Sequence, residues 1–321
     1  MNFLIFIILI LTAVVYLKVA TKFKIVDNPN ERSSHKNVTI RGGGIVFFIA
    51  VLLFFIFYDF KYPYFFIGLT LVAVISFVDD IMTLKSSIRF LVQLFAVILM
   101  LFELEVWNYP IIYIILSLFF ATGLLNIYNF MDGINGITGL NGIVIFLSLI
   151  YVNVFQIRFI DTNLLIAILS SLVVFGFFNF RKKAKFFAGD IGSISLGLTI
   201  IFCIGKLYLT SNQPLYLLFT LAYITDGGLT ILQRILKKKN IFKPHREHLY
   251  QLMVDTQVAS HMNVAMMYAF FQLVVCVLVI ISDGLVFKNL VFYVIMLGTF
   301  IAYMLFKRKL LKLINQNTLK R

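Results

Sequence analysis

Long apolar segments follow one another along almost the whole chain, and short polar connections separate them. We count about eleven such segments, each near the ~20 residues that a helix needs to cross a bilayer. They lie near residues 2–20, 43–58, 63–78, 88–105, 110–128, 137–154, 162–180, 191–210, 215–236, 262–282 and 287–306. The pattern predicts an all-α fold, a polytopic transmembrane helical bundle in which residues 1–321 form a single integral-membrane domain.

The composition is that of a chain that lies mostly in lipid. Hydrophobic residues make up 61% of the 321 residues and charged residues only 13%, whereas soluble domains carry roughly 25% charged residues. The first segment lacks the basic start and the small-residue cleavage site of a removable signal, so we interpret it as a span. Cys203 and Cys276 lie inside apolar segments, which indicates neither a disulfide framework nor a zinc site.

The positive charges are distributed asymmetrically. The net charge is +14, and most Lys and Arg residues fall in alternate connections. These basic connections lie near 21–42, 79–88, 181–190 and 237–261, with a further cluster in the C-terminal tail 307–321. The positive-inside rule places them in the cytoplasm, which predicts an N-terminus outside and a cytoplasmic C-terminus. The connection near 129–136 has no Lys or Arg but falls on the same side by count. Contact with anionic lipids is an additional reason for the basic residues.

Four aspartates fall at the predicted cytoplasmic face. Asp79 and Asp80 are adjacent at the end of the third segment, and Asp132 and Asp190 lie in later connections. Two adjacent carboxylates repel each other and resist desolvation, so they need counter-charges. Carboxylates that hold Mg²⁺ among cations are what phosphoryl transfer requires. Asp226 is a further acid, inside the ninth segment, to which we assign no role.

Cations, amides and histidines in the same connections are candidates for binding phosphate or nucleotide. They are Arg41, Arg89, Asn126, Asn129, Asn179, His245, Arg246 and His248. Gly42–Gly44 opens the second segment, where backbone amides can approach a phosphate, although a flexible turn explains these glycines equally well. The histidines lack the spacing and the nearby thiols of a zinc site. Together these residues predict membrane-embedded, Mg²⁺-dependent chemistry on phosphates.

These motifs resemble the polyprenyl-phosphate N-acetylhexosamine-1-phosphate transferases of the glycosyltransferase 4 family, to which phospho-N-acetylmuramoyl-pentapeptide transferase is related. The matching motifs are Asp79-Asp80, Asn126-x-x-Asn129-x-x-Asp132-Gly133, Phe187-x-Gly189-Asp190-x-Gly192-Ser193 and the ninth-segment Asp226. The motifs Arg32-Ser33-Ser34-His35 and Pro244-His245-Arg246-x-His248 look most like the O-antigen-initiating branch. The chain departs from the family at Asn135, where an acid is common, and after His248, where further histidines are usual.

The resemblance implies transfer of N-acetylhexosamine 1-phosphate from a UDP-sugar to undecaprenyl phosphate, with release of UMP. The sugar would be GlcNAc or a 6-deoxy-amino sugar such as FucNAc or QuiNAc, and the step would initiate an O-antigen-like cell-envelope polysaccharide. The resemblance also implies a multi-pass protein of the bacterial inner (cytoplasmic) membrane with its active site facing the cytoplasm. Homodimers occur in the resembled family, and no nucleic acid is expected as a partner.

The family pattern assigns roles to individual residues as well. Mg²⁺, with Mn²⁺ as a substitute, would be held chiefly by Asp190, with Asp80 or Asp132 close by. Asp79 would keep the lipid phosphate deprotonated and aimed for in-line attack. The residues expected to contact the nucleotide and the pyrophosphate are Asn126, Asn129, Asn179, Arg246 and His248.

Two alternatives stay open at this point. The first is phospho-N-acetylmuramoyl-pentapeptide transfer, which differs from the favoured reaction in its donor sugar. The second is a non-enzymatic membrane transporter of anionic substrates, which would place its acids at mid-depth within an inverted repeat. Only Asp226 lies at such a depth, so the sequence favours an enzyme.

Overall fold

The structure is a computed structural model that describes residues 1–27, 38–240 and 245–318. The predicted motif residues Arg32, His35 and Pro244 lie outside the described residues. Apart from one short pair of strands, the described elements are helical, so the prediction of an all-α bundle is confirmed. Within the described part of the chain, ten helices are long and apolar enough to cross a membrane. The protein is therefore a multi-pass membrane protein.

The first half of the chain forms six of these helices and one shorter helix. They are α1 (Asn2–Lys22), α2 (Ile45–Phe57), α3 (Pro63–Ile81), α4 (Ser86–Glu103), α5 (Ile111–Met131), α6 (Ile137–Phe155) and α7 (Thr162–Asn179). The shorter one is α2, whose 13 residues rise about 20 Å, less than the ~30 Å hydrocarbon core. The predicted count of about eleven segments thus corresponds to ten long helices and one short one. A 3-10 turn, η1 (Val106–Asn108), lies between α4 and α5.

The second half contains a broken span. It consists of α8 (Gly189–Ser211), η2 (Pro214–Thr220), α9 (Leu221–Tyr223), η3 (Ile224–Gly228), α10 (Leu229–Leu236), α11 (Leu249–Asp255), α12 (His261–Ser282) and α13 (Lys288–Thr318). The predicted ninth segment is not one α-helix, because it passes through the 3-10 turn η2 and the π-helical turn η3. Asp226 lies within η3. Such π-turns inside helices are frequent at functional sites.

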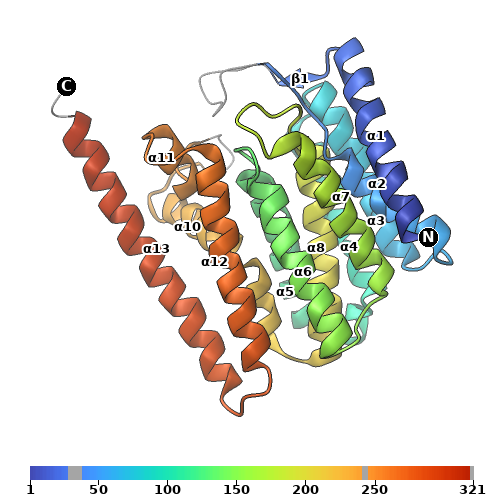
Figure 1. The fold of residues 1–321 in the computed structure, drawn as a ribbon. Helices are drawn as coiled ribbons and strands as arrows, with labels where there is room; N and C mark the ends of the chain where they lie inside the picture. The colour runs from blue at the N-terminus through green and yellow to red at the C-terminus, as the bar shows by residue number, and fades with distance from the viewer. Residues whose placement is uncertain (28–37, 241–244, 319–321) are drawn as a thin grey trace.

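The helices pack around α8. In α8, 83% of the most apolar stretch is buried inside the protein. In α13 the corresponding share is only 6%, and this helix stands at the edge of the bundle (Figure 1). Small residues let α8 approach α2, since a Cβ added to Gly44 would overlap the backbone of Gly192. The bundle therefore places the first residues of α8 deep between other helices, where their side chains must find protein partners.

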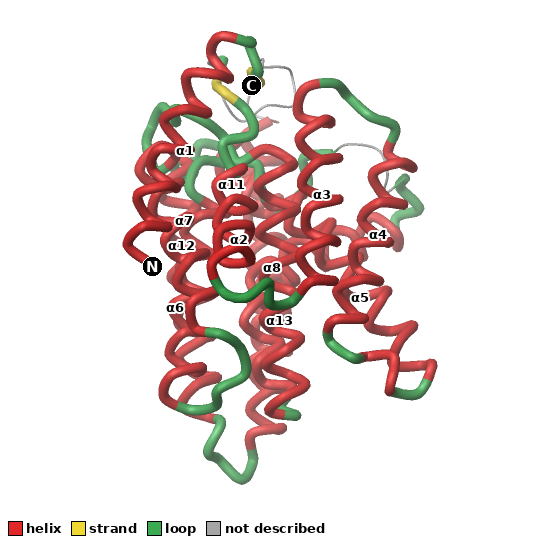
Figure 2. The backbone as a smooth tube through the Cα atoms, turned by 90° about the vertical axis from the view of Figure 1, so that its right-hand side faces the viewer, coloured by secondary structure: helices red, strands yellow, loops and turns green. Residues whose placement is uncertain are grey.

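One end of the bundle gathers segments that are far apart in the sequence. Strand β1 (Val26–Asp27) pairs antiparallel with β2 (Thr39–Ile40), and Ile40 bridges to Phe186. The strands and the C-terminal end of α13 lie at this same end (Figure 1), and Figure 2 also shows the strands at the end of the bundle. The described residues of the connections near 21–42 and 181–190 therefore lie together.

Candidate active site

Three aspartates and two arginines from four segments meet at the start of α8. Arg41, which follows β2, contacts Asp80 through Nε–Oδ1 at 2.6 Å and Asp190 through Nη2–Oδ1 at 2.8 Å. Arg89 of α4 uses Nη1 to contact Asp79 Oδ2 at 2.6 Å and Asp190 Oδ2 at 3.0 Å. The structure thus brings together five predicted site residues and supplies the counter-charges that the aspartate pair requires.

Asp80 caps the N-terminus of α8. Its Oδ1 accepts the backbone N–H of Asp190 at 2.9 Å, and its Oδ2 accepts that of Ile191 at 3.2 Å. These N–H groups have no partner within the helix and lie at the positive end of its dipole, so a carboxylate stabilises them. Gly189 permits this approach, because its φ is +73° and an added Cβ would overlap the Asp80 carboxylate. Asp80 is therefore part of the local structure as well as of the charged cluster.

Asp79 faces a different part of the chain. Its Oδ1 accepts the backbone N–H of Leu84 at 2.7 Å, which holds the turn after α3, and its Oδ2 pairs with Arg89. The two adjacent aspartates thus point to separate partners and share no counter-ion. Burial alone would lower the pKa of the Arg41 guanidinium, but Asp80 and Asp190 outweigh it and raise that pKa above its ordinary value. Arg41 is a permanent cation in this cluster.

Asp132 follows the last residue of α5 and is within electrostatic reach of the cluster. Thr138 Oγ1 donates a hydrogen bond to its Oδ1 at 2.5 Å. Burial raises the pKa of Asp132 to about 6, although the Thr138 hydrogen bond lowers it, and the charge of Asp190 adds to the increase. A carboxyl with a pKa this close to neutrality is a frequent feature of functional sites.

Of the two predicted asparagines of α5, one contacts α8 and the other bonds within α5. Asn129 Oδ1 accepts a hydrogen bond from Ser193 Oγ at 2.9 Å, one turn beyond Asp190. Asn126 Nδ2 donates to the carbonyl of Thr122 in its own helix at 2.9 Å. Their predicted contacts with a nucleotide stay predictions.

Two other asparagines tie neighbouring loops together. Gly136 N donates to Asn179 Oδ1 at 2.8 Å, and Asn179 Nδ2 donates to the carbonyl of Phe186 at 2.9 Å. Asn135 Nδ2 donates to the carbonyl of Arg181 at 2.9 Å. Both ends of the Asn179 amide thus bind backbone groups, which makes this side chain a brace between loops. The predicted contact of Asn179 with the nucleotide stays a prediction.

The two predicted histidines lie together beside the turn after α5. The rings of His245 and His248 stack with centroids 4.9 Å apart. Tyr250 OH donates to the carbonyl of Phe130 at 2.8 Å, and a Cβ added to Gly133 would overlap that hydroxyl. Burial, together with the charges of His248 and Arg234, lowers the pKa of His245 to about 4. His245 is therefore neutral near pH 7, where its ring can form hydrogen bonds but carries no positive charge.

Arg246, the remaining predicted substrate ligand, is engaged elsewhere. Its Nε donates to Asp255 Oδ2 at 2.9 Å, and its Nη2 pairs with Asp255 Oδ1. This bidentate pair joins the loop to the end of α11, so binding of a phosphate by Arg246 requires competition with Asp255.

Asp226 has a defined position that the sequence analysis did not assign. Its Oδ1 accepts the N–H of Leu249 at 2.8 Å, and its Oδ2 accepts that of Tyr250 at 3.1 Å. It therefore caps α11 in the way that Asp80 caps α8. His248 Nδ1 lies 3.8 Å from Asp226 Oδ1. The signal available in the sequence was a charge at membrane depth beside Gly227 and Gly228. Nothing in the local sequence indicated that Asp226 binds the start of α11.

The donor set at the start of α8 suits a cation such as Mg²⁺. Among the described residues, no three His, Cys, Asp or Glu side chains form a ready-made metal site. Mg²⁺ does not need one, since it commonly binds one or two carboxylates, several waters and the phosphates of the substrate. Both oxygens of Asp190 contact arginines, so a cation could bind this carboxylate in place of one of these contacts.

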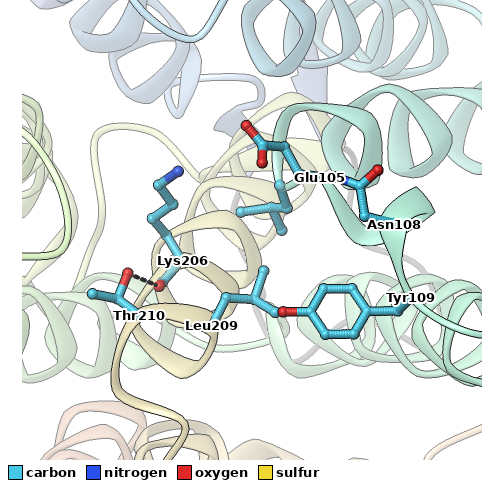
Figure 3. A pocket seen from close by; sticks show the side chains of 7 residues that line it. Glu105, Asn108, Tyr109, Lys206, Leu209 and Thr210 are labelled. Atoms are coloured by element: carbon cyan, nitrogen blue, oxygen red, sulfur yellow. Dashed lines mark hydrogen bonds between the residues drawn. The ribbon is translucent and has the colours of Figure 1, made fainter.

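A cavity of about 340 Å³ opens at the opposite end of α8 from Asp190 (Figure 3). Its lining residues are Leu104, Glu105, Asn108, Tyr109, Lys206, Leu209 and Thr210. The charged side chains of this cavity are Lys206 and Glu105. Neither belongs to the cluster: Lys206 lies 16 residues after Asp190, and Glu105 lies 25 residues after Asp80. The charged cluster, and not this cavity, is the candidate active site.

Comparison with known proteins identifies the part of the chain that contains the charged cluster at the start of α8. The profile of glycosyl transferase family 4 matches residues 62–207, which include all four predicted site aspartates but end before Asp226 and His248. The chain is 28% identical over 289 residues to a probable undecaprenyl-phosphate N-acetylglucosaminyl 1-phosphate transferase of Bacillus subtilis (strain 168), which covers 81% of this chain and 78% of that protein. It is 26% identical over 268 residues to undecaprenyl-phosphate alpha-N-acetylglucosaminyl 1-phosphate transferase of Salmonella typhi, covering 76% and 72%. The protein of the same description in Escherichia coli (strain K12) is 26% identical over 271 residues, with the same two coverages.

Proposed function

We propose, from the match of residues 62–207 to the profile of glycosyl transferase family 4 and from the likeness to the related transferases, that the chain transfers an N-acetylhexosamine 1-phosphate from its UDP-sugar to undecaprenyl phosphate. The observation that carries the proposal is the convergence of Asp79, Asp80 and Asp190 with two arginines at the start of α8. The names of the relatives make GlcNAc the first donor to test, and 6-deoxy-amino sugars are the next.

The reaction is a displacement at the sugar-bearing phosphorus of the donor. An oxygen of the lipid phosphate forms a new P–O bond there, and the bond to the UMP phosphate breaks, which yields a lipid diphosphate sugar and UMP. The lipid phosphate is itself a nucleophile, so an aspartyl-phosphate intermediate is unnecessary. Mg²⁺ bound at Asp190 would neutralise charge on the donor diphosphate.

The residues of the chain can position and neutralise both substrates. The guanidinium groups of Arg41 and Arg89 are planar and have several N–H donors. They would exchange their contacts with the Asp190 carboxylate for contacts with phosphate oxygens of the substrates. Asp79, which pairs with Arg89, would keep the lipid phosphate deprotonated. Asp132, with a pKa of about 6, is suited to accept a proton from a phosphate monoester, whose second pKa is also about 6. His248, close to Asp226, is a donor to the leaving phosphate.

We also propose the location of the reaction. The alternating basic connections favour a cytoplasmic active site, with the N-terminus outside and the C-terminus inside. The apolar helices fit the inner membrane of a bacterium, and initiation of an O-antigen-like polysaccharide is the process in which such a lipid-linked sugar is used. The lipid acceptor would reach the cluster from the bilayer and the nucleotide sugar from the aqueous side.

Purified full-length protein in detergent tests the proposal. It is incubated with Mg²⁺, undecaprenyl phosphate and each of a panel of radiolabelled UDP-N-acetylhexosamines, and the lipid-linked product and UMP are quantified together. We expect both products in equal amounts with at least one sugar. Absence of both the lipid-linked product and UMP with every sugar would overturn the proposed transferase activity. Uptake of UDP-sugar into proteoliposomes without lipid-linked product would favour a transporter instead.

A further inference from the structure

The last helix carries two inward-facing polar side chains although it is the most lipid-exposed helix of the bundle. Only 6% of the apolar window of α13 is buried. Yet Tyr303 and Lys307, one turn apart, are 7% and 4% exposed. A lysine withdrawn from water within an apolar bundle is costly, so it needs a partner that compensates its charge.

Two hydroxyl groups link Lys307 to a buried carboxylate. Lys307 Nζ donates to Thr230 Oγ1 at 2.8 Å and to Tyr303 OH at 2.9 Å. Tyr303 OH donates in turn to Asp226 Oδ1 at 2.9 Å, and Thr230 Oγ1 approaches the same oxygen at 3.4 Å. Each hydroxyl can accept from the ammonium group and donate to the carboxylate, so the hydrogen atoms of the network are consistent.

The far side of Asp226 faces the histidine loop. Its two oxygens accept the N–H groups of Leu249 and Tyr250, the first residues of α11. His248, the residue that precedes them, is 2% exposed and holds its Nδ1 3.8 Å from Asp226 Oδ1. Tyr268 OH also donates to Asp226 Oδ2, at 2.6 Å. The Asp226 side chain is only 1% exposed, so its ionised form depends on these hydrogen bonds and on nearby positive charge to offset the cost of burial.

We propose that Tyr303 and Lys307 are positioning residues of the transferase, which hold His248 in place through Asp226. This inference rests on the proposed function for its kinetic part and on geometry for its structural part. The ammonium of Lys307 compensates the buried carboxylate, which then fixes the first turn of α11. Without Lys307 or the Tyr303 hydroxyl, Asp226 is protonated or reached by water, and the turn that carries His248 loosens.

The variants Tyr303→Phe and Lys307→Met test this inference in the full-length protein. Each keeps the size of the side chain and removes one polar group of the network. Lys309→Met and Tyr293→Phe are matched controls, since both residues lie on α13 and are exposed. Two measurements are made on each variant. One is kcat and KM for the UDP-sugar, and the other is hydrogen exchange of the backbone amides at the start of α11, with those of α8 as internal reference.

We expect kcat to fall about tenfold or more in both variants while KM changes little, because a misplaced group near the reacting phosphates affects mainly the transition state. Exchange at Leu249 and Tyr250 should rise severalfold, with α8 unchanged, and both controls should match the natural protein. Control-like kinetics and exchange in Tyr303→Phe, the milder variant, would overturn the inference. If the natural protein forms no lipid product, the proposed function fails, and the exchange measurement still decides whether the network holds α11.

Discussion

The Asp80 carboxylate accepts the backbone N–H of Asp190 at 2.9 Å, 110 residues away in the sequence. One aspartate of the pair therefore builds the helix terminus on which the predicted metal ligand stands. Asp79, its neighbour, pairs with Arg89 and caps no helix. The two members of the pair thus have different tasks, which gives their substitutions different expected consequences.

Asp190→Asn should abolish the reaction without unfolding the protein. The amide keeps the shape of the side chain but cannot neutralise a cation, so we expect the rate of Mg²⁺-dependent UMP release to fall at least about 100-fold. UMP release from detergent-solubilised protein measures this loss. Asp59→Asn, at an exposed aspartate, is the control and should retain full activity. Retained activity in Asp190→Asn would remove this residue from the metal site.

Asp80→Ala should reduce stability as well as activity. It removes the acceptor for two N–H groups of α8 and leaves Arg41 with one carboxylate fewer. Loss of a helix cap costs about 0.5–2 kcal/mol, so we expect a fall of several degrees in the thermal midpoint in detergent. Asp59→Asn, at an exposed aspartate, serves as the comparison and should keep the natural midpoint. Equal midpoints for the two variants would mean that the cap contributes nothing.

Asn135→Asp should destabilise the protein, although an acid is common at this position in the resembled family. Asn135 Nδ2 donates to the carbonyl of Arg181 at 2.9 Å, and a carboxylate has no donor for that carbonyl. Loss of this partly buried hydrogen bond costs about 0.5–1.5 kcal/mol. The thermal midpoint of Asn135→Asp, compared with that of the exposed Asn108→Asp, measures this cost. An increase in midpoint would show that the loop can accept the family's usual acid.

The sequence predicted the helices well, because hydrophobic segment length is a local property. All eleven predicted segments contain helix, and Asp79, Asp80 and Asp190 meet as the motifs indicated. The break at η3 and the caps made by Asp80 and Asp226 were not predicted. Each depends on a partner more than 20 residues away, and pairings of this kind arise from packing rather than from local pattern.

His245 should contribute to the loss of stability in acid. Its pKa in the folded protein is about 4, below the ordinary value of about 6.5. The unfolded chain therefore binds the proton first, and stability falls as the pH drops from about 6.5 toward 4. The ring is partly exposed, so we expect an effect of about 1 kcal/mol. His245→Gln should show a smaller decrease in thermal midpoint between pH 7 and pH 5 than the natural protein, and an equal decrease in both would contradict the prediction.

Gly189→Ala should disrupt the site through the backbone alone. Gly189 has a φ of +73°, and an added Cβ would meet the Asp80 carboxylate and lie 2.7 Å from Gly42 N. An L-residue in this conformation costs about 1–3 kcal/mol, and the overlap pushes Asp80 away from the N–H groups that it caps. We expect a lower thermal midpoint and loss of UMP release in the same variant. Gly123→Ala, where nothing lies within 4 Å of the added Cβ, is the matched control and should raise or maintain the midpoint. If Gly189→Ala behaves like this control, the close approach of Asp80 to α8 is not required for the reaction.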